Sequence, residues 1–213
     1  MENIVQIVSI ILALSVAIIG HEIMHGAAAY RYGDSTAKNQ NRLSINPLVH
    51  IDPVGTVLVP ALLYFSGAPF LFGWAKPVPI NINIVLRNGG ENGAIVVALA
   101  GIIYNFLLAI IAFIIMSFLS NPNSIIMLFI NYFLIYTIVY NIILGIFNLF
   151  PIPPLDGSHA LMHLLRKYKF YKFANYMQKI SKYGMILLII IIATPLSKII
   201  FAPVKYILEF VLP

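Results

Sequence analysis

Hydrophobic residues fill this chain in long, nearly uninterrupted runs. Three runs cover residues 4–30, 94–119 and 125–150, and each exceeds the roughly 20 residues that a helix needs to cross the hydrocarbon core of a bilayer. The second and third runs are separated only by the polar, proline-containing residues 120–124, so we expect them to form an antiparallel helical hairpin. The pattern predicts an all-α polytopic membrane protein built as a helical bundle.

Two further apolar stretches are interrupted. Residues 54–74 follow Pro53 and contain Pro60, Pro69 and three glycines, which favours a broken or re-entrant element over a straight span. Residues 185–212 contain two prolines and two lysines, so they form one kinked span or two shorter pieces. We therefore expect about four to six membrane segments, one of them broken or re-entrant.

Residues 78–84 differ from the rest, because apolar and polar residues alternate there. This is the periodicity of a strand and not of a helix. The stretch therefore predicts a short β-like re-entrant hairpin with an exposed edge.

Basic residues predict how the spans are oriented. Arg31, Lys38 and Arg42 follow the first run, and the third run is followed by residues 158–183, in which six basic residues alternate with aromatic ones. The second group is typical of an interfacial helix, and both groups indicate the cytoplasmic face. Residues 31–93 must then begin and end on that face, as a re-entrant region. The N-terminus has no basic segment before its apolar run, so we expect a permanent span and not a cleaved signal peptide.

Composition agrees with a single integral membrane domain covering residues 1–213. The chain is 61% hydrophobic and only 9% charged, with a mean hydropathy of +0.93, whereas about a quarter of the residues in soluble proteins are charged. The net charge is +6, and the basic residues lie beside apolar segments. We therefore expect contact with the lipid bilayer and its anionic headgroups, and none with nucleic acid. The absence of cysteine excludes disulfides and thiolate ligands for zinc.

The end of the first run carries the strongest chemical signal, the pentad His21-Glu22-Ile23-Met24-His25. On a helix, residues four apart share a face, so both imidazoles can bind one metal ion while Glu22 reaches a bound water. The alternative is a pair of helix-end histidines at the membrane interface. Ionisable groups at membrane depth are costly and usually functional, which favours the metal site.

A catalytic zinc with two histidines needs a third protein ligand and an open position. Asp156 is a candidate, in the segment Asn148-Leu149-Phe150-Pro151-Ile152-Pro153-Pro154-Leu155-Asp156-Gly157 at the cytoplasmic end of the third run. The predicted topology places this segment level with the pentad, and its prolines prevent a regular helix. The alternative for Asp156 is a turn carboxylate after a helix stop.

Together, the pentad and the pattern N-x-x-P-x-P-P-L-D-G resemble the site-2 protease family of intramembrane zinc metalloproteases, specifically small members without PDZ or CBS domains. The resemblance implies one zinc ion per chain bound by His21, His25 and Asp156, with Glu22 as the general base and Asn148 as a second catalytic residue. It also implies cleavage of peptide bonds within or near transmembrane segments of membrane proteins, as in regulated intramembrane proteolysis. The expected location is a prokaryotic cell membrane, with the active site toward the cytoplasm.

Residues 73–79 and 101–105 resemble further stretches of that family, although Ile102 stands where the family has proline. Ordinary helix packing is the alternative for Gly101 and Asn105. His159 and His163 form another pair four apart, which we interpret as an interfacial surface pair. His50 and Asp52 are expected to serve a turn before Pro53.

Other functions stay open at this point. A membrane metal-ion transporter would also place histidines and carboxylates inside a membrane, and an inactive scaffold would keep the same fold. A homo-oligomer is compatible with the sequence. For residues 78–84 we expect either an edge that holds an unwound substrate strand or a plug at the cytoplasmic opening.

Overall fold

Three long helices dominate the computed structural model, which describes residues 1–65, 73–119 and 124–211. They are α1 (Glu2–Arg31), α4 (Ile82–Ser117) and α5 (Ile125–Leu149), and each is long and apolar enough to cross a bilayer. Within the described ranges the chain is helical with no strand, which confirms the all-α membrane bundle. The expected turn at 120–124 lies outside the described residues, except for Ser124, whose side chain caps α5.

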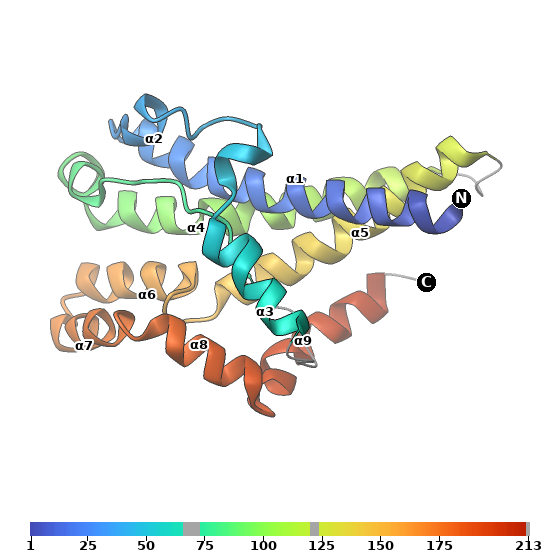
Figure 1. The fold of residues 1–213 in the computed structure, drawn as a ribbon. Coiled ribbons are helices and arrows are strands. Elements are labelled where there is room, and N and C mark those ends of the chain that lie inside the picture. The colour runs from blue at the N-terminus through green and yellow to red at the C-terminus, as the bar shows by residue number, and fades with distance from the viewer. Residues whose placement is uncertain (66–72, 120–123, 212–213) are drawn as a thin grey trace.

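The three helices pack against one another (Figure 1). One apolar core lies between α4, α5 and the C-terminal α9 (Leu196–Val211). Its buried members are Ala109, Ala112, Leu134, Ile138, Ile142, Ile146 and Val204. Small alanines on α4 face bulky residues on α5, which lets the two backbones approach closely.

The connection from α1 to α4 consists of short elements. These are α2 (Thr36–Asn39), the 3-10 turn η1 (Pro47–His50), the π-helical turn η2 (Pro53–Leu58) and α3 (Val59–Phe65). Asp52 accepts hydrogen bonds from the backbone N–H groups of Val54 and Gly55 at 2.9 and 2.7 Å, so it serves the turn before η2 as predicted. The interrupted apolar stretch is therefore broken, although its residues 66–72 lie outside the described ranges.

The predicted strand at residues 78–84 is wrong. Residues 73–80 run as an irregular strap, and α4 begins at Ile82, capped by Asn81. The backbone N–H groups of Trp74, Lys76 and Val78 donate to Gly55, His50 and Glu22 and not to a neighbouring strand. Pro77 and Pro79 have no backbone N–H and therefore cannot donate to a neighbouring strand. Apolar and polar side chains alternate in this stretch, but it lacks the row of backbone hydrogen bonds to a neighbour that a strand requires.

Helix α4 starts well before residue 94, where the apolar run had placed the span. Its first turns are separated from the rest by Gly90, whose backbone has φ 59° and ψ −157°. This conformation is open to glycine and strained for other residues. The break sets the first turns of α4 apart from its membrane-length part.

Four shorter helices complete the chain: α6 (Asp156–Lys167), α7 (Tyr171–Ser181), α8 (Gly184–Ala193) and α9. The basic stretch 158–183 thus forms two helices and not one, and residues 185–212 form two pieces. α7 and α8 meet at 75° and together could count as a fourth span. α6, α7 and α2 lie at one end of the bundle, and the N-terminus lies at the other (Figure 1).

Candidate metal centre

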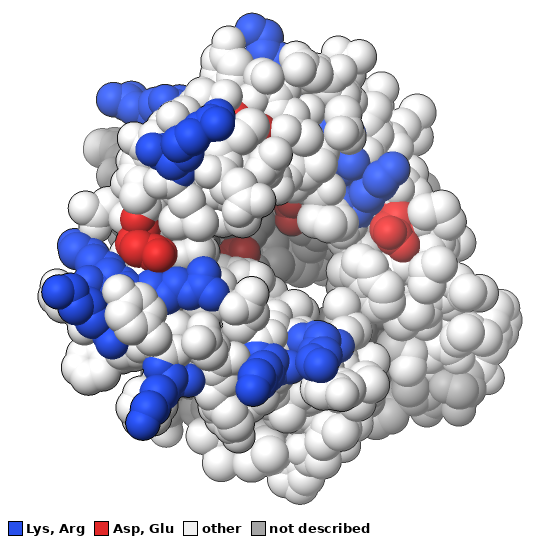
Figure 2. Space-filling view, turned by 90° about the vertical axis from the view of Figure 1, so that its left-hand side faces the viewer, with Lys and Arg blue, Asp and Glu red and all other residues white. Residues whose placement is uncertain are grey.

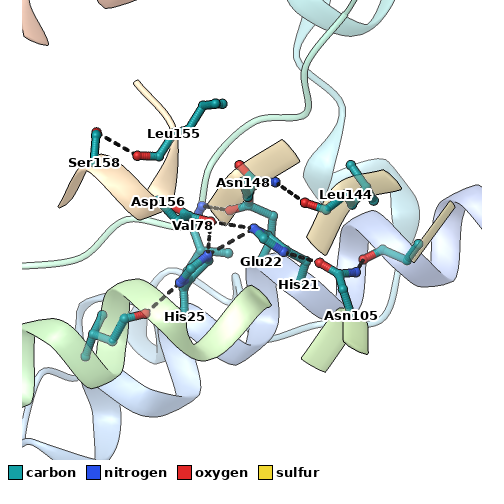
Figure 3. Close-up of polar contacts among 12 residues, drawn as sticks. His21, Glu22, His25, Val78, Asn105, Leu144, Asn148, Leu155, Asp156 and Ser158 are labelled. Atoms are coloured by element: carbon teal, nitrogen blue, oxygen red, sulfur yellow. Dashed lines mark hydrogen bonds and ion pairs between the residues drawn. The ribbon is translucent and has the colours of Figure 1, made fainter. Parts of the chain in front are cut away.

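His21, His25 and Asp156 meet at one point inside the bundle (Figure 3). The two histidines project from successive turns of α1, and Asp156 is the first residue of α6. The Asp156 carboxylate oxygen Oδ2 lies 3.0 Å from His21 Nε2 and 3.1 Å from His25 Nε2. The two Nε2 atoms lie 3.0 Å apart. Asp156, 131 positions after His25, therefore joins the two histidines in offering three ligand atoms to one site.

The spacing of these atoms fits a metal ion. Ligands on a tetrahedral zinc, at the usual zinc–nitrogen and zinc–oxygen distances, lie about 3.3 Å from one another. Three electron-rich atoms this close repel one another unless positive charge lies among them. Nitrogen and carboxylate oxygen are also donors that zinc accepts. The group can therefore hold a metal ion.

The other ring nitrogen of each histidine has a fixed partner. His25 Nδ1 donates to the Val97 carbonyl oxygen at 2.7 Å, and His21 Nδ1 donates to Asn105 Oδ1 at 2.6 Å. A carbonyl oxygen can only accept, so Nδ1 carries the proton in both neutral rings. Each Nε2 then presents its lone pair to the common point, which is the usual arrangement of metal-binding histidines.

Asn105 is itself held by three contacts and is completely buried. Its Nδ2 donates to Asn141 Oδ1 on α5 at 2.8 Å and to the Ala17 carbonyl at 3.2 Å. These bonds direct its Oδ1 toward His21. A polar network across α1, α4 and α5 therefore sets the orientation of one ligand.

Close approach of α4 to the histidines depends on Gly101. A Cβ atom at this position would lie 2.5 Å from His25 Nε2 and 2.6 Å from two atoms of the His21 ring. No side chain fits there without moving the ligands. The packing alternative for Gly101 is thus confirmed, but what it packs against is the metal-binding pair.

Asp156 reaches the site because α5 stops early. The prolines at 151, 153 and 154 turn the chain after α5 ends at Leu149, and α6 begins at Asp156. Gly157 lets the start of α6 lie against the Leu149 carbonyl, since a Cβ on it would overlap that group. Asp156 thereby brings its Oδ2 to within 3.0 and 3.1 Å of the Nε2 atoms of His21 and His25.

Glu22 lies beside this group and lines the same cavity as His25 and Asp156. Its Oε2 accepts a hydrogen bond from the Val78 N–H of the strap at 2.9 Å. Asn148, in the last turn of α5, donates through Nδ2 to the Leu144 carbonyl of its own helix at 3.1 Å (Figure 3). The second Nδ2 hydrogen of Asn148 is not used in that bond.

The cavity is a cleft of about 780 Å³ between the strap and α4 on one side and α6 and α7 on the other. Figure 2 views the end that carries α2, α6 and α7, and shows a hollow bordered by Lys and Arg side chains with acidic atoms inside it. The acidic groups that line the cleft are Glu22 and Asp156. The metal-binding group therefore lies in a cleft that opens at the basic end.

Other histidines have different surroundings. His163 is buried, contrary to the expected surface pair, and its Nδ1 lies 2.7 Å from Glu91 Oε2 of α4. His159 lines the cleft, and His50 contacts the Ser44 carbonyl at 2.8 Å. Sequence reasoning missed the Glu91–His163 pair and the Val97 carbonyl. A backbone carbonyl leaves no sequence signal, and the pair joins residues 72 positions apart.

Comparison with known proteins gives two matches for this chain. Residues 9–192 match peptidase family M50. A relative from Bacillus subtilis (strain 168), named "Putative zinc metalloprotease YwhC", is 33% identical over 199 residues, covering 91% of this chain and 84% of the relative. No solved structure gives a significant match. Both matches support a metallopeptidase, and the matched region contains the pentad and Asp156. The chain belongs to peptidase family M50.

Proposed function

We propose that the protein is a zinc-dependent intramembrane endopeptidase that hydrolyses peptide bonds within or near transmembrane segments of other membrane proteins. The observation that supports this most is the convergence of two imidazoles of α1 with the carboxylate of Asp156, beside Glu22. α1 is also one of the helices long and apolar enough to span a bilayer. The same donor set in a soluble protein would not require a substrate from the membrane.

His21, His25 and Asp156 would hold one zinc ion. Bound there, zinc would supply a water with its pKa lowered toward about 7 and a polarised substrate carbonyl. Glu22 accepts the proton of the attacking water and then donates it to the leaving amine. No covalent intermediate with the protein is needed, and the carboxylate of Glu22 is adjacent in sequence to a ligand, so its position is fixed by the same helix.

Two neighbours adjust this chemistry. The N–H of Val78 holds one oxygen of Glu22 and leaves the other to receive the proton. One Nδ2 hydrogen of Asn148 is not used in its bond to the Leu144 carbonyl. In this proposal that hydrogen is donated to the developing oxyanion and stabilises it.

The basic end of the bundle faces the cytoplasm in this proposal. Lys and Arg side chains gather at this end (Figure 2), as expected for the side of a membrane that retains positive charge. The cleft opens there, so the active site communicates with the cytoplasm of a prokaryotic cell while substrates arrive as membrane-spanning helices. Anionic headgroups would contact the exposed lysines of α7.

The test is cleavage of a panel of single-span peptides by purified protein in detergent or liposomes, with Glu22→Gln as the matched variant. Glutamine keeps the shape of the side chain but cannot take a proton. We expect kcat to fall by about 100-fold or more while zinc content stays at that of the wild type. A Glu22→Gln variant that cleaves normally would refute the assignment. Zinc flux into liposomes without cleavage would favour a transporter.

A further inference from the structure

Two cations line the catalytic cleft. They are Arg166 of α6 and Lys182, the residue after α7, and they line the same cavity as Glu22 and Asp156. The cleft therefore contains two positive charges in addition to the carboxylates at the metal-binding group. A polypeptide bound in this cleft would lie near both cations.

The chain supplies no carboxylate to either cation. All seven acidic residues are described in the structure, and in those parts of the chain none forms an ion pair with Arg166 or Lys182. Arg166 Nη2 instead donates to the neutral Gln178 Oε1 at 2.8 Å, and Lys182 Nζ lies 5.6 Å from the centre of the Tyr183 ring. Both contacts orient a positive charge without neutralising it.

The acidic residues have other partners. Glu22, Asp34 and Asp52 accept hydrogen bonds from backbone N–H groups, and Glu2 accepts one from Tyr132. Glu91 pairs with His163, Asp156 with the histidines, and Glu209 with Lys205. The acidic side chains of the described residues are therefore engaged elsewhere, so Arg166 and Lys182 can accept an anion from outside the chain.

We infer that Arg166 and Lys182 form a specificity subsite for an acidic side chain, an aspartate or glutamate, in the polar segment that flanks the substrate's transmembrane helix at the basic end. The inference rests on the proposed function. A peptide fits better than a lipid headgroup because both cations line the cleft that contains Glu22 and Asp156. Lys172 and Lys179 of α7, by contrast, do not line this cleft.

The expected size of the preference follows from partial exposure. A solvent-exposed ion pair contributes up to about 1 kcal/mol, which corresponds to about a fivefold change in an equilibrium or rate constant. Arg166 is half-buried and held by Gln178, so it should contribute near the upper end. The preference should shrink at high ionic strength, because salt screens exposed charges.

The experiment uses zinc-loaded full-length protein and one cleavable single-span peptide with an asparagine tail, in which a single aspartate is moved along the tail one position at a time. For the wild type we expect a window of positions in which aspartate raises kcat/KM about fivefold over asparagine, and lysine lowers it. The double variant Arg166→Gln/Lys182→Gln should abolish the window, and Arg166→Glu/Lys182→Glu should reverse it in favour of lysine. Lys172→Gln/Lys179→Gln is the matched control, and the window should persist in it.

The outcomes separate the two levels of the proposal. Cleavage of every peptide at the same rate, or a window that survives Arg166→Gln/Lys182→Gln, would overturn the subsite and leave the peptidase intact. An equal loss of kcat/KM in Arg166→Gln/Lys182→Gln and in Lys172→Gln/Lys179→Gln, for acidic and neutral peptides alike, would assign the cations to lipid headgroups. That result would also overturn the subsite. No cleavage of any peptide by the wild type would refute the proposed function itself. The fold of each variant is checked by its zinc content.

Discussion

At the scale of single residues, Asn105 controls the orientation of His21. Its Oδ1 accepts from His21 Nδ1 at 2.6 Å, and its Nδ2 is fixed by Asn141 and Ala17. We expect Asn105→Ala to weaken zinc binding by about 10- to 100-fold, the usual cost of losing such a partner. Competition with a chelator measures this. Ser117→Ala is the control, since Ser117 is exposed at the far end of α4 and its hydroxyl donates to the Ile114 carbonyl of its own helix. Equal zinc affinities of Asn105→Ala and the wild type would contradict this role.

Gly101 sets how closely α4 approaches the ligands. Gly101→Ala would place a methyl group 2.5 Å from His25 Nε2, so one or both imidazoles must move and zinc content should drop to well below half. Gly145→Ala is the comparison, because the nearest atoms to its added Cβ would belong to the Phe106 ring, at 3.0 Å and beyond. If the two variants bind zinc equally, the packing argument for Gly101 fails.

The pentad and Asp156 could be found from sequence because a zinc site requires particular residue types, and two histidines four residues apart share one face of a helix. Asn105 was visible as a candidate, but its partner could not be predicted, since nothing in the chain specifies which turn of α4 faces His21. Gly101 was also noted in the sequence, but the residues it packs against were not predictable. The Val97 carbonyl was out of reach, because its role depends on backbone position, which only packing determines.

At the scale of elements, α6 carries Asp156, and a partly buried pair joins it to α4. His163 Nδ1 and Glu91 Oε2 lie 2.7 Å apart, and His163 is buried. We expect Glu91→Gln to destabilise the protein by about 1.5–3 kcal/mol, the usual range for a hydrogen bond to a charged group, and to weaken zinc binding severalfold because α6 is held less firmly.

Unfolding in a denaturing detergent and zinc competition measure these two effects. Glu209→Gln provides the control, because its pair with Lys205 spans 3.7 Å between side chains that are both more than half exposed, and such pairs contribute about 0–1 kcal/mol. Similar losses in the two variants would argue against a special role for the Glu91–His163 pair.

Element boundaries show where periodicity is reliable. The three spans follow from long apolar runs, because only a helix of that length can cross a bilayer with its backbone satisfied. Residues 78–84 misled us, because alternation describes side chains, whereas a strand also needs a free backbone edge. Pro77 and Pro79 deny that edge, and Asn81 starts a helix instead. Those two prolines were the sequence signal that the alternation obscured.

At the scale of the whole molecule, charge and fold agree on one orientation. α2, α6 and α7 lie at the end opposite the N-terminus (Figure 1), and they carry many of the basic residues. The absence of native cysteine makes each introduced cysteine a unique label. In intact cells, an impermeant maleimide should label Asn3→Cys but label Lys38→Cys only after the cells are opened. The reverse pattern would invert the proposed topology.

The central claim is that Asp156 completes a metal site with the two histidines of α1. The most direct measurement is the zinc content of purified protein, compared between the wild type, Glu22→Gln and Asp156→Ala. The geometry predicts about one zinc per chain in the first two, as three protein ligands hold one ion, and a large loss in Asp156→Ala. Full zinc content in Asp156→Ala, with the affinity of the wild type, would contradict the account.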